Sequence, residues 1–515
     1  MKAQDYQISS EKFVFHSAGE NLHDTKLETK PISYFRDALN RFAKNKASIV
    51  ATVIILLLVL FAIFAPVFSP YTVAYEDVNY AFAIPKNKLF YDLGIPFWDG
   101  GQEKEVSEAT YQQYRAIEQE TRRTLIMTEP TTITEEYFGK TKTLYKFRLD
   151  TYYSVGVQYQ FLTTEQYQAI QKYQDENNVQ VIYPATNISK KQVAEQDLKD
   201  ANIWYKTKIG AGRKTTIVYN KKTGELQNIY IPNDGTDLYT SKMYWEGEEK
   251  LYNYAIPMQD NQWKVRVDYY EYYKYIHHVA GDGIKEPLFL FGANHAGKDV
   301  FTCLASGARF SFILALIVSS VNLFVGAIYG SIEGYYGGKI DLIMERIVDL
   351  LASIPFMIVI TLLKYHLNAS HILILFISFF LTGWTGMAGR TRMQFYRFKN
   401  QEYVLVARTL GAKDSRIMFK HIFPNAIGTL ITSSVLVIPG VIFSETSLSY
   451  LGIINLNTGN MTSVGTLLAT GQNYLYTYPH LILFPAIFIS LLMLSFNLFG
   501  NGLRDAFNPS LRGTE

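Results

Sequence analysis

An uncharged run of 22 residues, ASIVATVIILLLVLFAIFAPVF from Ala47 to Phe68, constrains this chain more than any other feature. As a helix rising 1.5 Å per residue, it is long enough to cross a hydrocarbon core of roughly 30 Å. A cleaved signal peptide would have an apolar stretch of only about 7–15 residues near the terminus, whereas residues 1–46 come first here. We therefore expect a membrane span. Its amino side is expected in the cytoplasm, because basic residues crowd that side: Arg36, Arg41, Lys44 and Lys46.

The composition shows a second, water-exposed part. Only 18% of the 515 residues are charged, against about a quarter in an average soluble domain. Residues 84–288 are nevertheless polar and charged, so the deficit lies in the long apolar stretches around them. The lone Cys303 excludes an intramolecular disulfide framework and a cysteine-based zinc site. A net charge of +3, with basic residues at membrane edges, does not favour nucleic acid as a partner.

Five further apolar stretches are predicted to span the membrane: Arg309 to Tyr329, Ile347 to Leu363, His371 to Ala388, Ala426 to Phe443, and His480 to Gly500. With the first run the total is six, so both termini are expected in the cytoplasm. The strongly basic loop 389–425 between the fourth and fifth spans is then cytoplasmic, as the positive-inside rule requires.

The predicted spans carry no charged side chain at mid-membrane depth. The nearest candidate, Asp349, falls at the cytoplasmic end of the third span. Ion-coupled transporters generally place ionisable groups inside the membrane, so energy for moving a solute is expected to come from outside the bilayer. Pro439 followed by Gly440 would bend the fifth span, and small residues such as Gly326 allow close helix packing.

Residues 71–289, between the first and second spans, are expected to form an extracellular domain of mixed α and β structure. The alternation in 214–232 predicts a hairpin that turns near 222–224, and 264–276 predicts a strand. Helical patterning covers 103–123 and 164–177. The many tyrosines are interpreted as strand residues, the alternative being a peptide-binding or docking face. A formal glycosylation acceptor at Asn187 is taken as chance.

The string GANHAGKD, Gly292 to Asp299, nearly matches a phosphate-binding loop. Asp299 stands where a serine or threonine hydroxyl would hold magnesium, and neither a strand before it nor a βαβ unit after it is predicted. We therefore expect no nucleotide there and no ATPase site in this chain.

The segment Gln401 to Ala426 is the most informative for function. Helical spacing places Val404, Ala407 and Leu410 on one face, and Pro424 interrupts the pattern before the fifth span. A short amphipathic helix joined directly to two spans is a mechanical handle. The alternative is a basic helix that lies on the lipid surface.

This segment resembles the EAA loop of ABC importer permeases, in which a glycine follows the Glu-Ala-Ala core after three residues and a proline stands thirteen positions later. Ala407, Gly411 and Pro424 occupy those positions. The core reads Leu-Val-Ala and lacks its glutamate, and His421 and Phe423 also depart from the general pattern. The strings EYVLVAR, LGA and HIFPN are similar to the oligopeptide and dipeptide branch.

Three further stretches resemble the C-type subunit of that branch: Phe291 to Phe312, Gly334 to Pro355, and Asn497 to Gly513. The resemblance covers roughly residues 31–70 and 286–513, and the outer domain lies beyond it.

The resemblance implies an all-α, six-span type I ABC importer permease bundle with an inserted α/β domain. The expected parts are a cytoplasmic segment 1–46, a first helix 47–70, the outer domain 71–289, a permease core 290–503 containing the coupling loop 389–425, and a cytoplasmic tail 504–515. The expected residues for coupling to ATPase subunits are Glu402, Tyr403, Val404, Ala407, Arg408, Leu410, Gly411, Ala412 and Pro424.

The implied function is oligopeptide import by a chain that is itself no enzyme and holds no cofactor or metal. ATP and magnesium would bind two cytoplasmic ATPase subunits. A second permease subunit would complete the pathway, and an extracellular lipoprotein would deliver peptide. Dipeptides, peptide pheromones and metal chelates remain alternative cargoes. A large outward domain favours the cell membrane of a bacterium without an outer membrane.

Two other classes fit less well. A four-span ABC protein of the export or mechanotransmission type would have three spans after its outer domain, whereas five are predicted here. A sensory receptor would need a larger cytoplasmic effector. The outer domain is expected to dock the substrate-binding protein or to cap the entrance.

Overall fold

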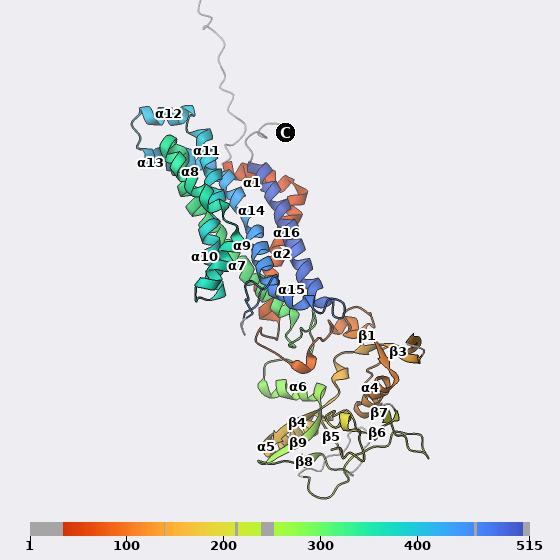
Figure 1. The fold of residues 1–515 in the computed structure, drawn as a ribbon. Helices are drawn as coiled ribbons and strands as arrows, with labels where there is room; N and C mark the ends of the chain where they lie inside the picture. Colours follow the sequence, from red (N-terminus) through yellow and green to blue (C-terminus); the bar gives the residue numbers. More distant parts are fainter. Residues whose placement is uncertain (1–33, 138–139, 212–214, 238–251, 458–460, 508–515) are drawn as a thin grey trace, which may run out of the picture.

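The computed structural model describes residues 34–137, 140–211, 215–237, 252–457 and 461–507. Two parts of different construction lie end to end (Figure 1). A bundle of long helices occupies one end, and a domain of short strands and helices occupies the other. The chain enters this domain after α2 and leaves it before α7.

The bundle contains both the long helices and several short ones. In chain order they are α1 Tyr34–Lys44, α2 Lys46–Phe68, α7 Val300–Tyr336, α8 Gly338–Ser353, α9 Phe356–His366, α10 His371–Thr382, α11 Thr385–Phe398, α12 Glu402–Thr409, α13 Asp414–Arg416, the π-helical η6 Ile417–Ile422, α14 Phe423–Tyr450, α15 Val464–Gln472 and α16 His480–Phe507.

Among the described residues, five helical stretches are long and apolar enough to cross a membrane: Lys46–Phe68, Val300–Tyr336, His371–Phe398, Asp414–Tyr450 and His480–Phe507. A sixth span exists only if α8 and α9, which meet at a bend of 76°, are counted together. The bend falls within the predicted third span. Its cause is Pro355, which holds Ile354 in an extended conformation and so ends α8.

Glycines on α7 allow a close backbone contact with α11. Gly326, Gly330 and Gly334 recur every four residues and face α11. A Cβ atom on Gly330 would lie 2.2 Å from the carbonyl oxygen of Ala388. The predicted packing role of Gly326 is therefore confirmed, because no larger residue fits against the α11 backbone.

The long spans extend beyond their predicted ends. The predicted fifth span ends at Phe443, but α14 continues to Tyr450 and buries Glu445 completely. The hydroxyls of Ser311 and Ser449 donate to its carboxylate at 2.8 and 3.1 Å. Hydrogen bonds from small polar residues hold this carboxylate inside an apolar bundle.

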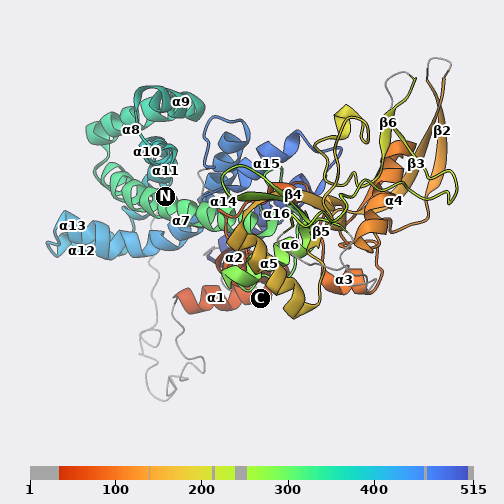
Figure 2. The same cartoon turned by 90° about the horizontal axis from the view of Figure 1, so that it is seen from below.

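The α/β domain is built from short elements: η2 Val78–Tyr80, α3 Lys88–Asp92, β1 Gly101–Ser107, α4 Glu108–Thr121, β2 Thr131–Tyr137, β3 Lys140–Asp150, η3 Tyr153–Val155, β4 Val157–Thr163, α5 Thr164–Asn177, β5 Ile182–Tyr183, η4 Glu195–Asp197, β6 Thr207–Ile209, β7 Thr215–Ile217, β8 Ala255–Pro257, β9 Gln262–Asp268 and α6 Tyr269–Ala280. One antiparallel sheet has the order β1-β3-β2, and a second has the order β4-β9-β5 with β8 also on β9. Strands β2 and β3 project on the side opposite to α8–α10 (Figure 2).

The predicted strand 264–276 is wrong in its second half. Strand β9 ends at Asp268, whose side chain accepts a hydrogen bond from the Tyr270 N–H and caps α6. Tyr269, Tyr273 and His277 then fall four residues apart on the buried face of a helix. Aromatic residues are compatible with a strand or a helix, and here the capping side chain of Asp268 favours the helix.

Two other predictions for this domain need correction. The expected helix 103–123 begins only at Glu108, because Glu103 pairs with Arg148 in the β1–β3 ladder. The hairpin expected over 214–232 is reduced to a turn with a single bridge between Tyr219 and Leu226, and β7 pairs instead with β6. Residue 214 itself lies outside the described residues.

Tyrosines fill the core of the domain. Tyr80, Tyr152, Tyr269 and Tyr273 pack with Phe289 near the junction with the bundle. Their burial speaks against a docking face, but the interpretation as strand residues is wrong for these four tyrosines, which lie in η2, a turn and α6. Deeper in the domain, the guanidinium of Arg266 pairs with Glu120 at 2.8 Å, and both side chains are buried.

Candidate coupling surface

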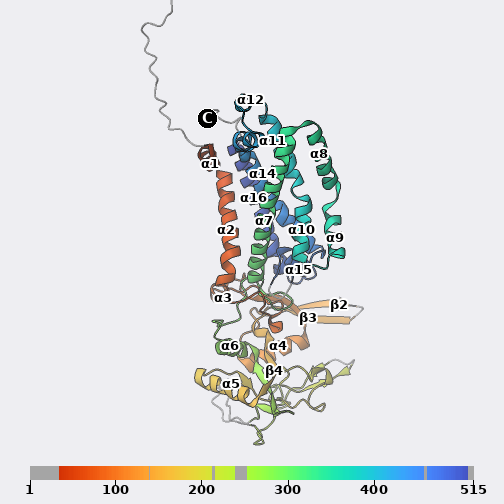
Figure 3. The same cartoon turned by 90° about the vertical axis from the view of Figure 1, so that its left-hand side faces the viewer.

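Helix α12 lies at the end of the bundle farthest from the α/β domain (Figures 1 and 3). It begins after Gln401 and ends at Thr409. Gly411 follows with a φ of +78°, a left-handed conformation that glycine adopts at low cost. The chain thereby turns back toward the membrane helices within a few residues.

The inner side of α12 is fastened to the bundle. Val404 is buried with Tyr335 of α7, Phe395 of α11 and Ile417 of η6. The Tyr335 hydroxyl donates to the Asp414 carboxylate at 2.6 Å. A displacement of α12 would therefore push on the ends of α7, α11 and α14 together.

The outer side of α12 is apolar and uncovered. We call it the coupling face and define it by Tyr403, Leu405, Val406 and Leu410, all of which are exposed. Val406 is 57% exposed and Leu410 is 81% exposed. A compact cluster of this kind on an otherwise basic loop is typical of a protein contact surface.

The structure divides the predicted site residues between these two sides. Val404 and Ala407 are both buried, but Leu410 is not on their face as expected, because the helix ends at Thr409 and Leu410 caps it. The remaining predicted residues are exposed or partly exposed: Glu402, Tyr403, Arg408, Gly411, Ala412 and Pro424.

Pro424 was expected to interrupt the helical pattern before the fifth span, but the helix continues through it. The chain is helical from Asp414 to Tyr450, with the π-helical η6 just before the proline. A proline lacks the N–H that would bond four residues back and clashes with that carbonyl, and a wider π turn relieves both problems. The chain from Asp414 into the fifth span therefore forms one continuous helix, which a turn at Gly411 connects to α12.

An ion-pair cluster braces the bundle beside this surface. Arg392 of α11 binds Asp341 of α8 through two hydrogen bonds of 2.6 and 3.0 Å. Its guanidinium also lies 3.3 Å from Glu345 and 3.4 Å from Glu333 of α7. One cation therefore ties three helices together.

Sequence reasoning missed Leu405, Val406, Tyr335 and the Arg392 cluster. The exposed Leu405 and Val406 stand where the EAA core differs from its pattern, and that departure was the available signal. Tyr335 and Arg392 act through long-range contacts that helical spacing does not reveal.

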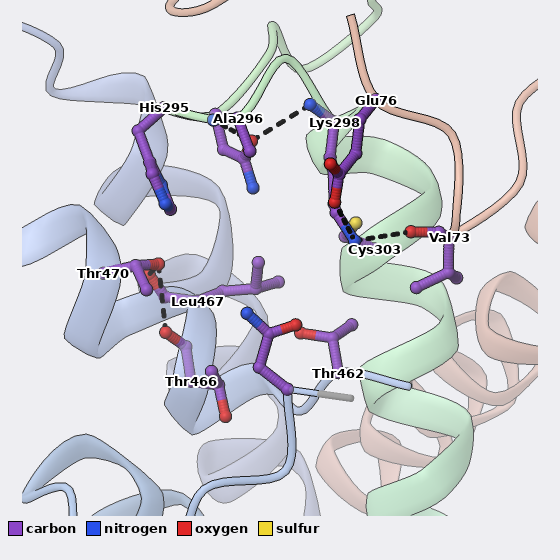
Figure 4. Close-up of a pocket in the computed structure, with 12 residues that line it drawn as sticks. Val73, Glu76, His295, Ala296, Lys298, Cys303, Thr462, Thr466, Leu467 and Thr470 are labelled. Carbon is purple, nitrogen blue, oxygen red and sulfur yellow. Dashed lines mark hydrogen bonds and ion pairs between the residues drawn. The ribbon is translucent and has the colours of Figure 1, made fainter. Parts of the chain in front are cut away.

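A polar cavity of about 270 Å³ lies at the opposite end of the bundle, where the α/β domain meets α7 and α15 (Figure 4). The Lys298 ammonium lies 3.1 Å from the Glu76 carboxylate and donates to the Val73 carbonyl. His295, Thr466 and Thr470 line the other side.

The residues of the loop 292–299 do not fit a nucleotide phosphate. The Asp299 carboxylate caps α7 by accepting from the Thr302 N–H, so a negative charge already occupies the helix N-terminus. Burial raises the pKa of Asp299 to about 6, against the hydrogen bonds from Thr302 that lower it. Lys298, which a phosphate would need, is paired with Glu76.

The α/β domain also contacts the loop between α15 and α16. The Phe82 ring stacks on Tyr478 with the centroids 4.5 Å apart and meets Tyr474 edge-on at 4.7 Å. The Gln102 amide donates to the Thr477 carbonyl at 3.2 Å. The domain is therefore joined to the bundle at a loop as well as through the chain itself.

Comparison with known proteins gives two family matches. Residues 322–513 match the family described as binding-protein-dependent transport system inner membrane component. Residues 33–85 match the N-terminal transmembrane domain of oligopeptide transport permease C. Neither match includes residues 86–321, which contain most of the α/β domain.

Individual relatives agree with these matches. The chain is 42% identical to the oligopeptide transport system permease protein OppC of Bacillus subtilis over 222 residues, which are 43% of this chain and 72% of the relative. It is 39% identical to the dipeptide transport system permease protein DppC of the same organism, covering 43% of this chain and 69% of the relative. Escherichia coli OppC is 36% identical over 43% of this chain and 72% of its own length.

Proposed function

This chain belongs to the oligopeptide and dipeptide permease family of ABC importers, and from that premise we propose that it carries oligopeptides inward as one half of a translocation pathway. It is an integral membrane protein and a transport subunit, not an enzyme. The oligopeptide cargo is proposed because two of the relatives named above are oligopeptide permeases.

The proposal depends above all on α12. Its inner side is buried against α7, α11 and η6, while its outer side presents an uncovered apolar cluster. We propose that two cytoplasmic ATP-binding subunits, which hold ATP and magnesium, grip this face on the two permease subunits. Val404 and Ala407 transmit the movement inward, and Tyr403, Val406 and Leu410 receive it.

In the proposed cycle, ATP binding draws the two motor subunits together and moves α12 as a rigid body. The bundle then switches between inward-open and outward-open arrangements, and hydrolysis resets it. Glu402 and Arg408 lie beside the coupling face and set the charge around it. Gly411, Ala412 and Pro424 form the turn and the helix start that connect the handle to α14. This mechanism requires a bundle with two stable arrangements and a helix, α12, whose movement is transmitted to it.

The proposed topology places α12 in the cytoplasm with both chain ends and counts α8 and α9 as one bent span. Helices α1 and α12 and the end of α16 lie at one end of the bundle, and the α/β domain lies at the other (Figure 1). The basic residues around α11 and α12 support a cytoplasmic position. The domain would then be extracellular, in a bacterium without an outer membrane.

We further propose that the α/β domain receives an extracellular peptide-binding lipoprotein or covers the pathway entrance. Its contacts with Tyr474 and Tyr478 support this role, because they fix it beside the loop that precedes the last span. Removing residues 87–288 tests the role, and the two ends left by the deletion already lie side by side, since the Lys86 N–H donates to the Phe289 carbonyl at 3.0 Å. Unaltered uptake and unaltered affinity for the lipoprotein would count against it.

Dipeptides are the second candidate cargo, because the chain is nearly as similar to the dipeptide permease DppC. Competition for uptake of a labelled pentapeptide separates the two. Unlabelled oligopeptides should compete strongly and dipeptides weakly. The reverse order would establish the dipeptide reading and overturn the oligopeptide proposal.

A further inference from the structure

A short segment of the α/β domain exposes several large apolar side chains in water-facing positions. It consists of α3 and the loop that follows, residues 88–98, which we call the interfacial segment. Leu89 and Leu93 are each 64% exposed, and Ile95 and Phe97 are exposed beside them. Four such residues within nine positions exceed what a solvent-facing loop of a soluble domain normally carries.

Ring contacts fix this segment at the level of the membrane helices. The Trp98 ring stacks on Phe484 of α16 with the centroids 6.0 Å apart and the planes 5° from parallel. Phe484 in turn stacks on Phe291 at 4.1 Å, and Phe291 lies 6.5 Å from Phe61 of α2. Because Phe484 is four residues inside α16, the segment lies at the outer edge of the spans rather than above it.

The exposed side chains continue an apolar surface that a bilayer covers. At the outer end of α2, Val67 and Phe68 are exposed, and on the first turns of α16 Leu483 and Ile487 are exposed. The contact between the Trp98 and Phe484 rings places the segment beside the first turns of α16. The exposed apolar surface of α16 therefore continues onto the interfacial segment.

The segment is held rigidly in this position. The Arg148 guanidinium donates to the Pro96 carbonyl at 3.2 Å and pairs with Asp99 at 2.6 Å. The Asn87 side chain caps α3 by accepting from the Leu89 N–H. Contacts within the α/β domain already fix the conformation of the segment. Little conformational entropy is therefore lost when its side chains enter the lipid.

We propose that the interfacial segment inserts Leu89, Leu93, Ile95 and Phe97 into the outer-leaflet boundary between headgroups and acyl chains. The occupant of this surface is lipid, because the surface adjoins the exposed apolar side chains on the first turns of α16. Lys88 and Asp92 are exposed between the apolar residues and remain at headgroup level. The contact anchors the α/β domain at a fixed height above the bundle, and the assignment to the outer leaflet rests on the proposed topology.

The test uses the full chain in lipid nanodiscs, with a fluorescent NBD probe on a single introduced cysteine. Phe97→Cys and Leu93→Cys report on the segment, and Lys222→Cys, on an exposed turn of the domain, is the control. The wild-type chain, whose Cys303 is buried, measures background labelling. Each sample is quenched by a phosphatidylcholine spin-labelled near its headgroup and, separately, by aqueous iodide.

We expect the spin-labelled lipid to reduce the emission of the segment probes by about twofold or more, with iodide having little effect. The control should show the opposite order. Free quenching by iodide at both segment positions would overturn the proposal in favour of a solvent-exposed loop. Shielding from both quenchers would overturn it in favour of a protein partner.

A second variant tests the same idea without relying on one probe position. With the probe at Leu89→Cys, the pair Leu93→Asp and Phe97→Asp should lower lipid quenching about twofold, whereas Leu93→Met and Phe97→Met should preserve it. Equal quenching in both pairs would contradict an anchoring role for Leu93 and Phe97.

Discussion

The bundle and the α/β domain belong to one chain, but their secondary structure is determined by different physical constraints. In the bundle, each predicted span corresponds to helix, and the differences concern ends and the bend at Pro355. In the domain, elements of the wrong type were predicted around Glu103 and Tyr270. A bilayer forces each apolar stretch to satisfy its own backbone, so hydropathy alone determines helix there. In water, tertiary contacts choose between structures that the same residues allow.

The largest expected effect tests whether the bundle depends on backbone contact between α7 and α11. Gly330→Leu would drive a side chain into the backbone of Ala388. We expect at least about 3 kcal/mol less stability and little folded protein, measured by thermal unfolding and yield in mild detergent. Gly386→Leu, whose Cβ would meet no atom within 4 Å, should stay near wild type. Equal losses would contradict the role of backbone contact, because leucine forms helix better than glycine at both positions.

The next prediction tests whether the α/β domain can be destabilised without unfolding the bundle. Arg266→Met leaves the buried Glu120 carboxylate without its cation, and we expect about 3–5 kcal/mol of local destabilisation. Limited proteolysis should cut within the α/β domain while the bundle stays intact. Adding Glu120→Leu should restore most of the resistance, because no buried charge remains. Cleavage throughout the bundle would contradict the independence of the two regions.

A third prediction concerns pH at the junction of the two regions. Burial holds the pKa of Asp299 at about 6, above its ordinary value of 3.8. The folded state therefore keeps the proton more tightly, and the stability from this group is complete below about pH 4 and lost as the pH rises through 6. Asp299→Asn should remain neutral and still cap α7.

The stability of Asp299→Asn relative to wild type should therefore increase between pH 5 and pH 7, by no more than about 3 kcal/mol. Thermal unfolding at both pH values measures this change. Asp260→Asn, on an exposed turn, provides the control and should show no such trend. A relative stability of Asp299→Asn that falls with rising pH would contradict the assignment.

The smallest effect concerns the Arg392 cluster. Arg392→Ala removes the cation shared by Asp341, Glu345 and Glu333. Because the arginine is a quarter exposed, we expect only about 1–2 kcal/mol of destabilisation. Peptide uptake should fall more than stability, since the cluster braces the helices beside α12. Arg397→Ala, an exposed neighbour, should affect neither.

The sequence predicted the function, whereas the coupling role of the candidate residues stays a prediction. Helical spacing placed Val404 and Ala407 on one face, and the structure adds that both are buried against the bundle. Leu410 was misplaced, because spacing extends a face past the end of a helix and cannot show that Gly411 turns the chain. The burial of Glu445 was not predicted, because a charged residue ends a hydropathy run even where hydroxyl groups donate to it in the interior.

The most direct test of the central claim concerns the coupling face. Val406→Asp places a charge in that face, and Val279→Asp makes the same change at a comparably exposed position of the α/β domain. After affinity purification from native membranes, the ATP-binding subunits are measured by bound nucleotide and ATPase activity. We predict recovery with wild type and Val279→Asp and about tenfold less with Val406→Asp at equal yield of the chain. Equal recovery with both variants, or no ATPase with wild type, would contradict the proposed coupling.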